Sequence, residues 1–203
     1  MGRLRGELKS SQDSWWGSHT IINPDTGEPY MTRYWIGKLR LHVFVRGDQD
    51  PDCHDHPWDF WTFPLTSYVE EVLHEQRQAY AARGHPPPPK FYRVTHVVKR
   101  FRLHKRAAEH CHLVLGSFEG YEKPTFSDDF NHITQEWQKR PLIGNRRIIT
   151  IVWQAGVRRK WGFWKNREGR WCWEFWKDYI LNGGKNAPCG DGPATPPPPK
   201  PRR

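Results

Sequence analysis

The chain has 203 residues, a length that suits one domain with a tail and leaves little room for two full domains. Its 12 Trp, 10 Phe and 7 Tyr supply enough apolar surface for a core, which excludes wholesale disorder. The formal net charge of +10 favours anionic partners such as nucleic acid, nucleotides or phosphorylated sugars.

Membrane and export signals are missing from the sequence. No apolar run approaches the roughly 18–20 residues that cross a bilayer. The basic N-terminal stretch is followed by no apolar segment, so it does not resemble a signal peptide. We therefore expect no membrane partner and a cytoplasmic location. A disulfide framework belongs to secreted chains, so the cysteines are expected to be free thiols: Cys53, Cys111, Cys172 and Cys189.

The first quarter of the chain begins with a polar segment and then alternates. Residues 1–30 carry two turn signals and predict an N-terminal arm or a short edge hairpin. Residues 34–46 alternate between apolar and mostly polar positions, so they predict one half-buried antiparallel strand. Its buried face is expected to carry Leu39, Leu41, Val43 and Val45, and its outer face Lys38, Arg40, His42, Phe44 and Arg46.

Most of the remaining pattern is typical of short strands. The segments predicted as strands are 59–73, as one or two strands broken near Pro64, then 91–103, 110–115, 147–154 and 157–164. Loops are expected at 47–58 and 117–145, a short helix or loop at 75–84, an extended proline run at 86–89, and a terminal helix at 170–180. Residues 181–203 are rich in proline and predict a disordered tail. The whole pattern indicates an all-β sandwich or barrel.

The segment most informative about chemistry is the loop that begins at Pro51. In an extended chain, His54 and His56 point to the same side and present two imidazoles to one spot. Neutral imidazoles suit a first-row transition metal, and a carboxylate from Asp59 would complete the set of two histidines and one carboxylate typical of non-haem Fe(II). Asp59 alternatively braces the loop or orients a ligating imidazole.

A second histidine pair, His110 and His112, offers the ligand that would close such a site. This pair also lies at positions i and i+2 of a predicted strand. Metal sites in β-barrels combine strands that are distant in sequence. One member of the pair is therefore expected to join His54 and His56, with the other behind it or at the surface.

The run HDHPWDF at residues 54–60 resembles the first motif of the cupin superfamily, in which two histidines precede an acidic residue and a turn. Gly47 stands one residue further from His54 than the usual motif glycine, and Asp59 stands where a glutamate usually follows at a longer spacing. The second cupin motif is weaker, since no P-x-G precedes the late histidine. Together with the later HCHLVL and KWGFW, the run is similar to small, uncharacterised, phage-associated cupin-like proteins, and the resemblance covers residues 34–180.

The resemblance implies an all-β, cupin-type double-stranded β-helix, or jelly roll, with a C-terminal helical cap. The domain organisation would be an N-terminal arm at 1–30, a barrel at 31–180 and a disordered tail at 181–203. The family pattern favours His112 over His110 as the late ligand, because its histidine stands just before an alternating apolar pair. The cofactor would be one divalent transition metal, with Fe(II) favoured and Mn, Ni or Zn as alternatives. A phage-encoded protein would work in the host cytoplasm.

The function implied by this resemblance is a metal-dependent enzyme, an oxygenase of the non-haem Fe(II) type that acts on a small substrate. The cationic surface favours an anionic substrate such as a nucleotide or a sugar phosphate. The side chains expected at the barrel mouth are Tyr68, Glu70, Arg102 and Trp161. Trp161 also fits core packing, and Glu70 could ligate the metal instead. The basic run at 158–160 is expected to be a solvated face.

Other functions stay open from the sequence. A non-catalytic cupin module would hold a structural metal or none. A metal-free isomerase or epimerase of sugar nucleotides would use a histidine as general base beside a tyrosine. Nucleic acid would bind through the basic surface and the proline-rich tail. A homodimer, which is frequent among cupins, is also compatible with the sequence.

Overall fold

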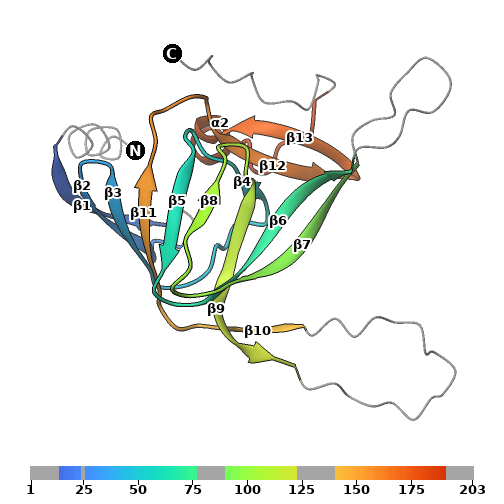
Figure 1. Cartoon of the computed structure of the whole chain (residues 1–203). Coiled ribbons are helices and arrows are strands. Elements are labelled where there is room, and N and C mark those ends of the chain that lie inside the picture. The colour runs from blue at the N-terminus through green and yellow to red at the C-terminus, as the bar shows by residue number, and fades with distance from the viewer. Residues whose placement is uncertain (1–13, 24–25, 77–89, 123–139, 191–203) are drawn as a thin grey trace, which may run out of the picture.

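The computed structural model describes residues 14–23, 26–76, 90–122 and 140–190, and most of them lie in strands (Figure 1). The strands are β1 (Trp16–Ile22), β2 (Pro29–Ile36), β3 (Leu39–Phe44), β4 (Cys53–His54), β5 (Phe60–Pro64), β6 (Tyr68–Gln76), β7 (Lys90–Val98), β8 (His104–Arg106), β9 (His112–Tyr121), β10 (Pro141–Gly144), β11 (Ile148–Gln154), β12 (Gly162–Arg167) and β13 (Arg170–Phe175). A short helix, α2 (Trp176–Leu181), follows them. No helix within these ranges is long and apolar enough to span a membrane.

The strands form two antiparallel sheets whose order defines the architecture. The first sheet has the order β1-β2-β3-β11-β5-β8, and the second has the order β13-β12-β4-β9-β6-β7. Within them, β3-β11-β5-β8 faces β4-β9-β6-β7, and the chain passes from one sheet to the other in the order of an eight-stranded jelly roll. The all-β jelly-roll fold that the sequence predicts is thus confirmed. The hairpins β1–β2 and β12–β13 widen one sheet each.

Several element boundaries differ from the prediction, each for a local reason. The single strand expected at 34–46 is wrong, because Gly37 adopts a positive φ of 54° and turns the chain between β2 and β3. The expected break near Pro64 separates β5 from β6. The helix expected at 170–180 is limited to α2, because β13 pairs residue by residue with β12 over the first half of that segment. The loop expected at 117–145 is wrong at both ends, because residues 117–121 continue β9 and residues 141–144 form β10. Its middle part, 123–139, lies outside the described residues, as do 77–84 and the proline run 86–89.

The inner and outer faces of β3 are the reverse of the prediction. In the sheet register, Phe44 lies opposite Ile148 and His42 lies opposite Thr150, and both partners are buried. Phe44 packs on the inner cluster formed by Tyr68, Val98, Val114 and Ile148. Burial and the nearby charge of Arg33 hold the pKa of His42 well below its usual value. The mostly polar face therefore points into the barrel, and the leucine and valine face points outward.

A second apolar cluster lies on the other side of the sheet that contains β4 and β9. Its buried members are Cys53, Cys111, Leu113 and Trp164. Each cysteine immediately precedes a histidine of the predicted metal site, and neighbouring residues of an extended chain point to opposite faces. The two histidines consequently point toward the interior of the barrel.

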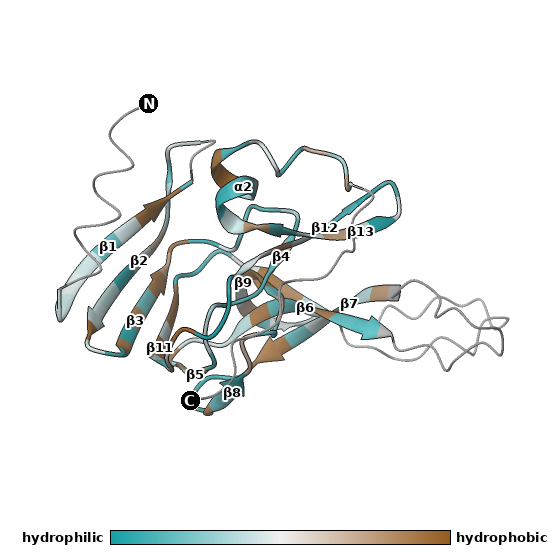
Figure 2. Cartoon of the chain, turned by 90° about the horizontal axis from the view of Figure 1, so that it is seen from above, coloured by the Kyte–Doolittle hydropathy of each residue, from teal (hydrophilic) through white to brown (hydrophobic). Residues whose placement is uncertain are grey.

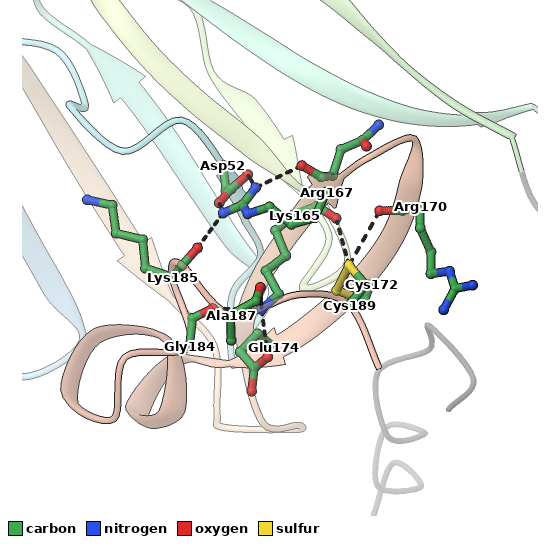
Figure 3. Close-up of a disulfide and its surroundings, with 11 residues drawn as sticks. Asp52, Lys165, Arg167, Arg170, Cys172, Glu174, Gly184, Lys185, Ala187 and Cys189 are labelled. Carbon is green, nitrogen blue, oxygen red and sulfur yellow. Dashed lines mark hydrogen bonds and ion pairs between the residues drawn. A yellow bond between two sulfur atoms is a disulfide. The ribbon is translucent and has the colours of Figure 1, made fainter. Parts of the chain in front are cut away.

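Residues 182–190, expected in the disordered tail, run back over the β12–β13 hairpin (Figure 3). Cys189 forms a disulfide with Cys172 of β13, so the prediction of four free thiols is wrong for this pair, while Cys53 and Cys111 are free. The amino group of Lys165 is fully buried, donates to the carbonyl oxygens of Gly184 (2.6 Å) and Ala187 (3.1 Å), and lies 3.1 Å from a carboxylate oxygen of Glu174. Residues 191–203 lie outside the described residues.

We expect two thiols, those of Cys53 and Cys111, to react in the unfolded chain without reductant, and four after reduction. Replacing Cys172 and Cys189 with serine should lower the free energy of unfolding by about 2–3 kcal/mol, because the bond closes a loop of 17 residues. Thiol titration and urea unfolding test both statements. Reductant should destabilise the wild type and leave the double variant unchanged. Four reactive thiols in unreduced protein would contradict the pairing.

Candidate metal centre

The segment that carries His54 and His56 is fixed by the residue between them. Asp55 points to the opposite side and is almost fully buried. Its carboxylate accepts hydrogen bonds from the backbone N–H of Gly162 (2.7 Å) and the indole N–H of Trp173 (3.0 Å), and it pairs with Arg159 at 3.0 Å. The expectation of a solvated basic run at 158–160 is therefore wrong for Arg159, whose side chain is buried. These contacts hold the backbone so that both imidazoles face the barrel interior.

His112 joins them from β9. The sheet register places it directly opposite His54. The ring centres of His54, His56 and His112 are 5.1–5.2 Å apart in all three pairs, and each ring offers one nitrogen within 4.8 Å of the others. Three imidazoles from two distant parts of the sequence therefore converge on one point.

The distances fit the needs of a metal ion. Two nitrogens that each lie about 2.1 Å from one ion are roughly 3.0 Å apart at a right angle and roughly 3.4 Å apart at a tetrahedral angle. The Nε2 atoms of His56 and His112 are 3.1 Å apart. Burial lowers the pKa of His54 to about 4 and holds that of His56 well below its usual value. Near neutral pH these imidazoles are thus uncharged, which is the state that binds metals.

Glu70 supports His112 from behind. This glutamate of β6 is completely buried, and one carboxylate oxygen lies 2.8 Å from Nδ1 of His112 while the other lies 2.6 Å from the guanidinium of Arg106. Burial by itself would raise the pKa of Glu70, but the hydrogen bond with His112 and the charge of Arg106 outweigh it and lower the pKa to about 2. The charged carboxylate accepts the Nδ1–H of His112, which leaves Nε2 free to bind a metal.

A second group shares His112 with the first. Glu70, His110 and His112 also offer ligand atoms within 4.8 Å of one another. The carboxylate of Glu70, however, forms an ion pair with Arg106. The Nε2 atom of His110 lies 3.9 Å from the same carboxylate oxygen. In the group of three histidines, each ring offers one nitrogen that is not engaged in an ion pair with an arginine. This group is therefore the better candidate for a metal site.

Asp59 lies outside both groups. One carboxylate oxygen accepts the backbone N–H of Ala108 (2.9 Å), and the other pairs with Arg158 at 2.6 Å. Ala108 in turn accepts the backbone N–H of His56 through its carbonyl oxygen at 2.9 Å. Of the three roles expected for Asp59 (metal ligand, brace of the loop, or support for a ligating imidazole), its contacts fit the brace.

The four residues expected at the barrel mouth occupy different places. Glu70 lies beside the histidines, as described above. Tyr68 is buried in the inner apolar cluster, and burial together with the charge of Glu70 raises its pKa. Arg102 is exposed in the loop between β7 and β8. Trp161 lies 6.4 Å from His54 between ring centres and stacks on Trp176.

A cavity of about 400 Å³ adjoins the glutamate. Its lining residues are Glu70, Val72, His74, His96, Val97, Val98, His104, Arg106 and His110. Three buried nitrogens of this lining have no hydrogen-bond partner among the described residues, namely Nε2 of His74, Nε of Arg106 and Nε2 of His110. Buried polar atoms are rarely left without a partner, so the cavity suits a polar ligand.

Arg106 is the residue of this region that the sequence did not single out. It belongs to the three-residue strand β8, which pairs with β5 and which the sequence pattern does not resolve. Its partner Glu70 is 36 positions away on the other sheet. The need for a cation here follows from the burial of Glu70, which only the structure shows, so the sequence carried no signal for Arg106.

Comparisons with known proteins find similarity only to solved structures, and this similarity is weak. No protein-family model matches the chain, and no curated protein matches its sequence. Among solved structures it is similar to Fe(II)-HppE with the alternative substrate (S)-1-HPP, with a TM-score of 0.37 and 8% identity over 69% of this chain and 56% of that one. It is also similar to the DMSP lyase DddQ from Ruegeria pomeroyi DSS-3, with a TM-score of 0.28 and 16% identity over 74% of this chain and 53% of that one. The chain thus spans little more than half the length of each.

Proposed function

We propose that the protein is a metal-dependent enzyme of the cupin type, a non-haem Fe(II) oxygenase acting on a small anionic substrate. The observation that carries the proposal is the convergence of His54, His56 and His112, with Nε2 atoms of two rings 3.1 Å apart. Three protein ligands would leave positions of an octahedral ion open for substrate and O₂. A bound Fe(II) would supply Lewis acidity and the capacity to react with O₂.

The residues around the metal ligands favour an enzyme over a purely structural site. Glu70 and Arg106 hold His112 in one orientation, which fixes the ligand before any metal binds. A cavity of about 400 Å³ lies behind Glu70 and Arg106 and is large enough for a small metabolite, although its lining does not include His54, His56 or His112. Its unpartnered nitrogens include Nε of Arg106, which can only donate, so the cavity favours a ligand rich in acceptor oxygens. Carboxylates and phosphates have this chemistry.

Metal content of the full chain is the decisive measurement. After incubation with Fe(II), Mn(II), Ni(II) or Zn(II) and removal of excess metal, we expect about one metal ion per chain by mass spectrometry. His54→Ala and His112→Ala should each abolish stoichiometric binding, because each removes one of three ligands. His110→Ala is the matched control, and it should retain the metal.

The outcomes separate the proposed site from its alternatives. Loss of metal in His110→Ala with retention in His54→Ala would assign the metal to the group with Glu70 instead. No metal with any of the four ions would overturn the enzyme proposed here and favour a binding module or a metal-free isomerase. For a loaded site, O₂ consumption by the Fe(II) form with pools of small carboxylates and phosphates tests the oxygenase assignment. No consumption with any pool would contradict it.

A further inference from the structure

The cavity beside Glu70 lies along the side of the barrel where both sheets end. β8 is the last strand of the first sheet and β7 the last strand of the second, and in the described part of the chain these two strands do not pair with each other. Glu70 and His74 of β6 share the inner face with His96 of β7. From the opposite sheet, β8 contributes His104 and Arg106, and Figure 2 shows this strand in hydrophilic teal. Both sheets therefore place polar side chains around one space.

Three side chains of this lining carry a buried nitrogen that has no hydrogen-bond partner among the described residues. These nitrogens are Nε2 of His74, Nε of Arg106 and Nε2 of His110. They come from three separate segments, namely β6, β8 and the loop before β9. Buried donors without acceptors destabilise a folded chain, so a ligand that supplies the acceptors gains all three hydrogen bonds at once.

The chemistry of the lining favours an anion over a metal ion. Nε of Arg106 can only donate, and the guanidinium brings a positive charge that repels a cation. Among the described residues, neither of the two groups that could hold a metal includes His74 or His96. The carboxylate of Glu70 is already engaged by Arg106 and His112. An oxyanion carries several acceptor oxygens, so one ion can accept from the guanidinium and from both imidazoles, and hydrogen bonds to charged partners are the strong ones.

We propose that this cavity is a binding site for a small oxyanion, a phosphate or a carboxylate, additional to the candidate metal centre. Nε of Arg106 donates to the anion while Nη2 of the same guanidinium donates to Glu70 at 2.6 Å. His74 and His110 supply the two further donors through Nε2–H. Glu70 bonds to Nδ1 of His112, whereas the proposed metal ligand is Nε2, which points away from Glu70. The anion therefore contacts the support of His112 and not the metal.

Glu70 and the anion share one guanidinium, and this sharing predicts how they affect each other. Both are negatively charged and both draw on the positive charge of Arg106 in a poorly solvated place, where charges interact strongly. Glu70 consequently limits the affinity for the anion. Glu70→Gln should bind sulfate several-fold more tightly than the wild type, whereas an anion held elsewhere on the chain would not respond.

Isothermal titration of the full, metal-free chain with sulfate at constant ionic strength tests the site. We expect one sulfate per chain with a Kd at or below about 1 mM. His74→Leu removes one donor and leaves the pair of Glu70 and Arg106 in place, so it should weaken binding roughly tenfold or more. Arg106→Lys is the second variant and should do the same, because lysine has a single nitrogen and cannot donate from two positions. His19→Leu is the matched control at the far edge of the first sheet, on β1, and should bind like the wild type.

Two results would overturn the proposal. The first is the absence of saturable binding of sulfate, inorganic phosphate or acetate up to about 10 mM, which would mean that the cavity holds water only. The second is binding that His74→Leu and Arg106→Lys leave unchanged, which would place the anion on another surface, such as the hollow lined by Arg100, Arg146 and Arg147. Competition of sulfate by phosphate and by acetate distinguishes the two classes of oxyanion. All titrations use metal-free protein, so the failure of the proposed metal site would leave this test intact.

Discussion

Replacing Glu70 with glutamine should lower the free energy of unfolding by about 3–5 kcal/mol and weaken metal binding by roughly 10–100-fold. The carboxylate is fully buried, and its two oxygens are taken by Arg106 and His112. Removing its charge leaves the guanidinium of Arg106, whose side chain is only 18% exposed, without its counter-ion. It also removes the strongest acceptor for Nδ1 of His112, so this ligand loses its fixed orientation. Urea unfolding and metal titration measure the two effects.

Glu71→Gln is the matched control for this experiment. Glu71 is the next residue of β6, points to the opposite face, and pairs with Arg93 at 3.3 Å in a partly exposed position. Exposed pairs of this kind contribute less than about 1 kcal/mol, and Glu71 points away from the face of the sheet that carries the three histidines. Equal losses of stability in the two variants, or unchanged metal affinity in Glu70→Gln, would contradict the supporting role of Glu70.

Replacing Asp52 with alanine should cost about 3–5 kcal/mol of folding free energy. Asp52 is 2% exposed and receives three hydrogen bonds, two from the guanidinium of Arg167 (3.1 and 2.7 Å) and one from the phenol of Tyr179 (2.9 Å). The hydrogen bonds that Arg167 donates to Asp52 raise the pKa of Arg167, and burial raises the pKa of Tyr179. Without the carboxylate, the buried hydroxyl group of Tyr179 loses its acceptor, and the partly exposed guanidinium of Arg167 loses its counter-ion. Urea unfolding with wild type in parallel gives the difference.

Asp50→Ala provides the comparison two residues earlier. Asp50 pairs with Lys185 at 2.8 Å, but both side chains are more than a quarter exposed, so the change should cost less than about 1 kcal/mol. The two variants remove the same group from the same loop and differ in burial. A cost for Asp52→Ala as small as that for Asp50→Ala would show that α2 and the hairpin are held by other contacts.

The sequence predicted the fold class because period-two alternation survives in most strands. It also placed His54 and His56 on one side of an extended segment, which is where the structure has them. The alternating pattern alone does not distinguish His110 from His112 as the third ligand. The preference for His112 came only from the resemblance to the cupin motif. In the structure, His112 belongs to both groups that could hold a metal.

The errors have physical causes that the sequence pattern does not report. Alternation at β3 separates two faces but does not say which one is inside, and a barrel that keeps arginine and histidine in its interior reverses the usual assignment. The pair of Cys172 and Cys189 has no local signature, because the disulfide depends on the path of residues 182–190. Arg106 becomes important only through a register that joins β8 to β5. Each of these features is decided by tertiary contacts.

The strand β4, which carries the first of the three proposed metal ligands, is only two residues long, and its shortness has a consequence for how the protein folds during synthesis. Its flanking carboxylates are held by partners 107 to 127 positions later in the chain, namely Gly162, Arg167, Trp173 and Tyr179. Contacts of such long range form late in folding. All three histidines will have left the ribosome well before these partners do. A nascent chain therefore carries all three histidines for some time without the ordered site, and binding of the proposed metal should follow completion of the C-terminal hairpin.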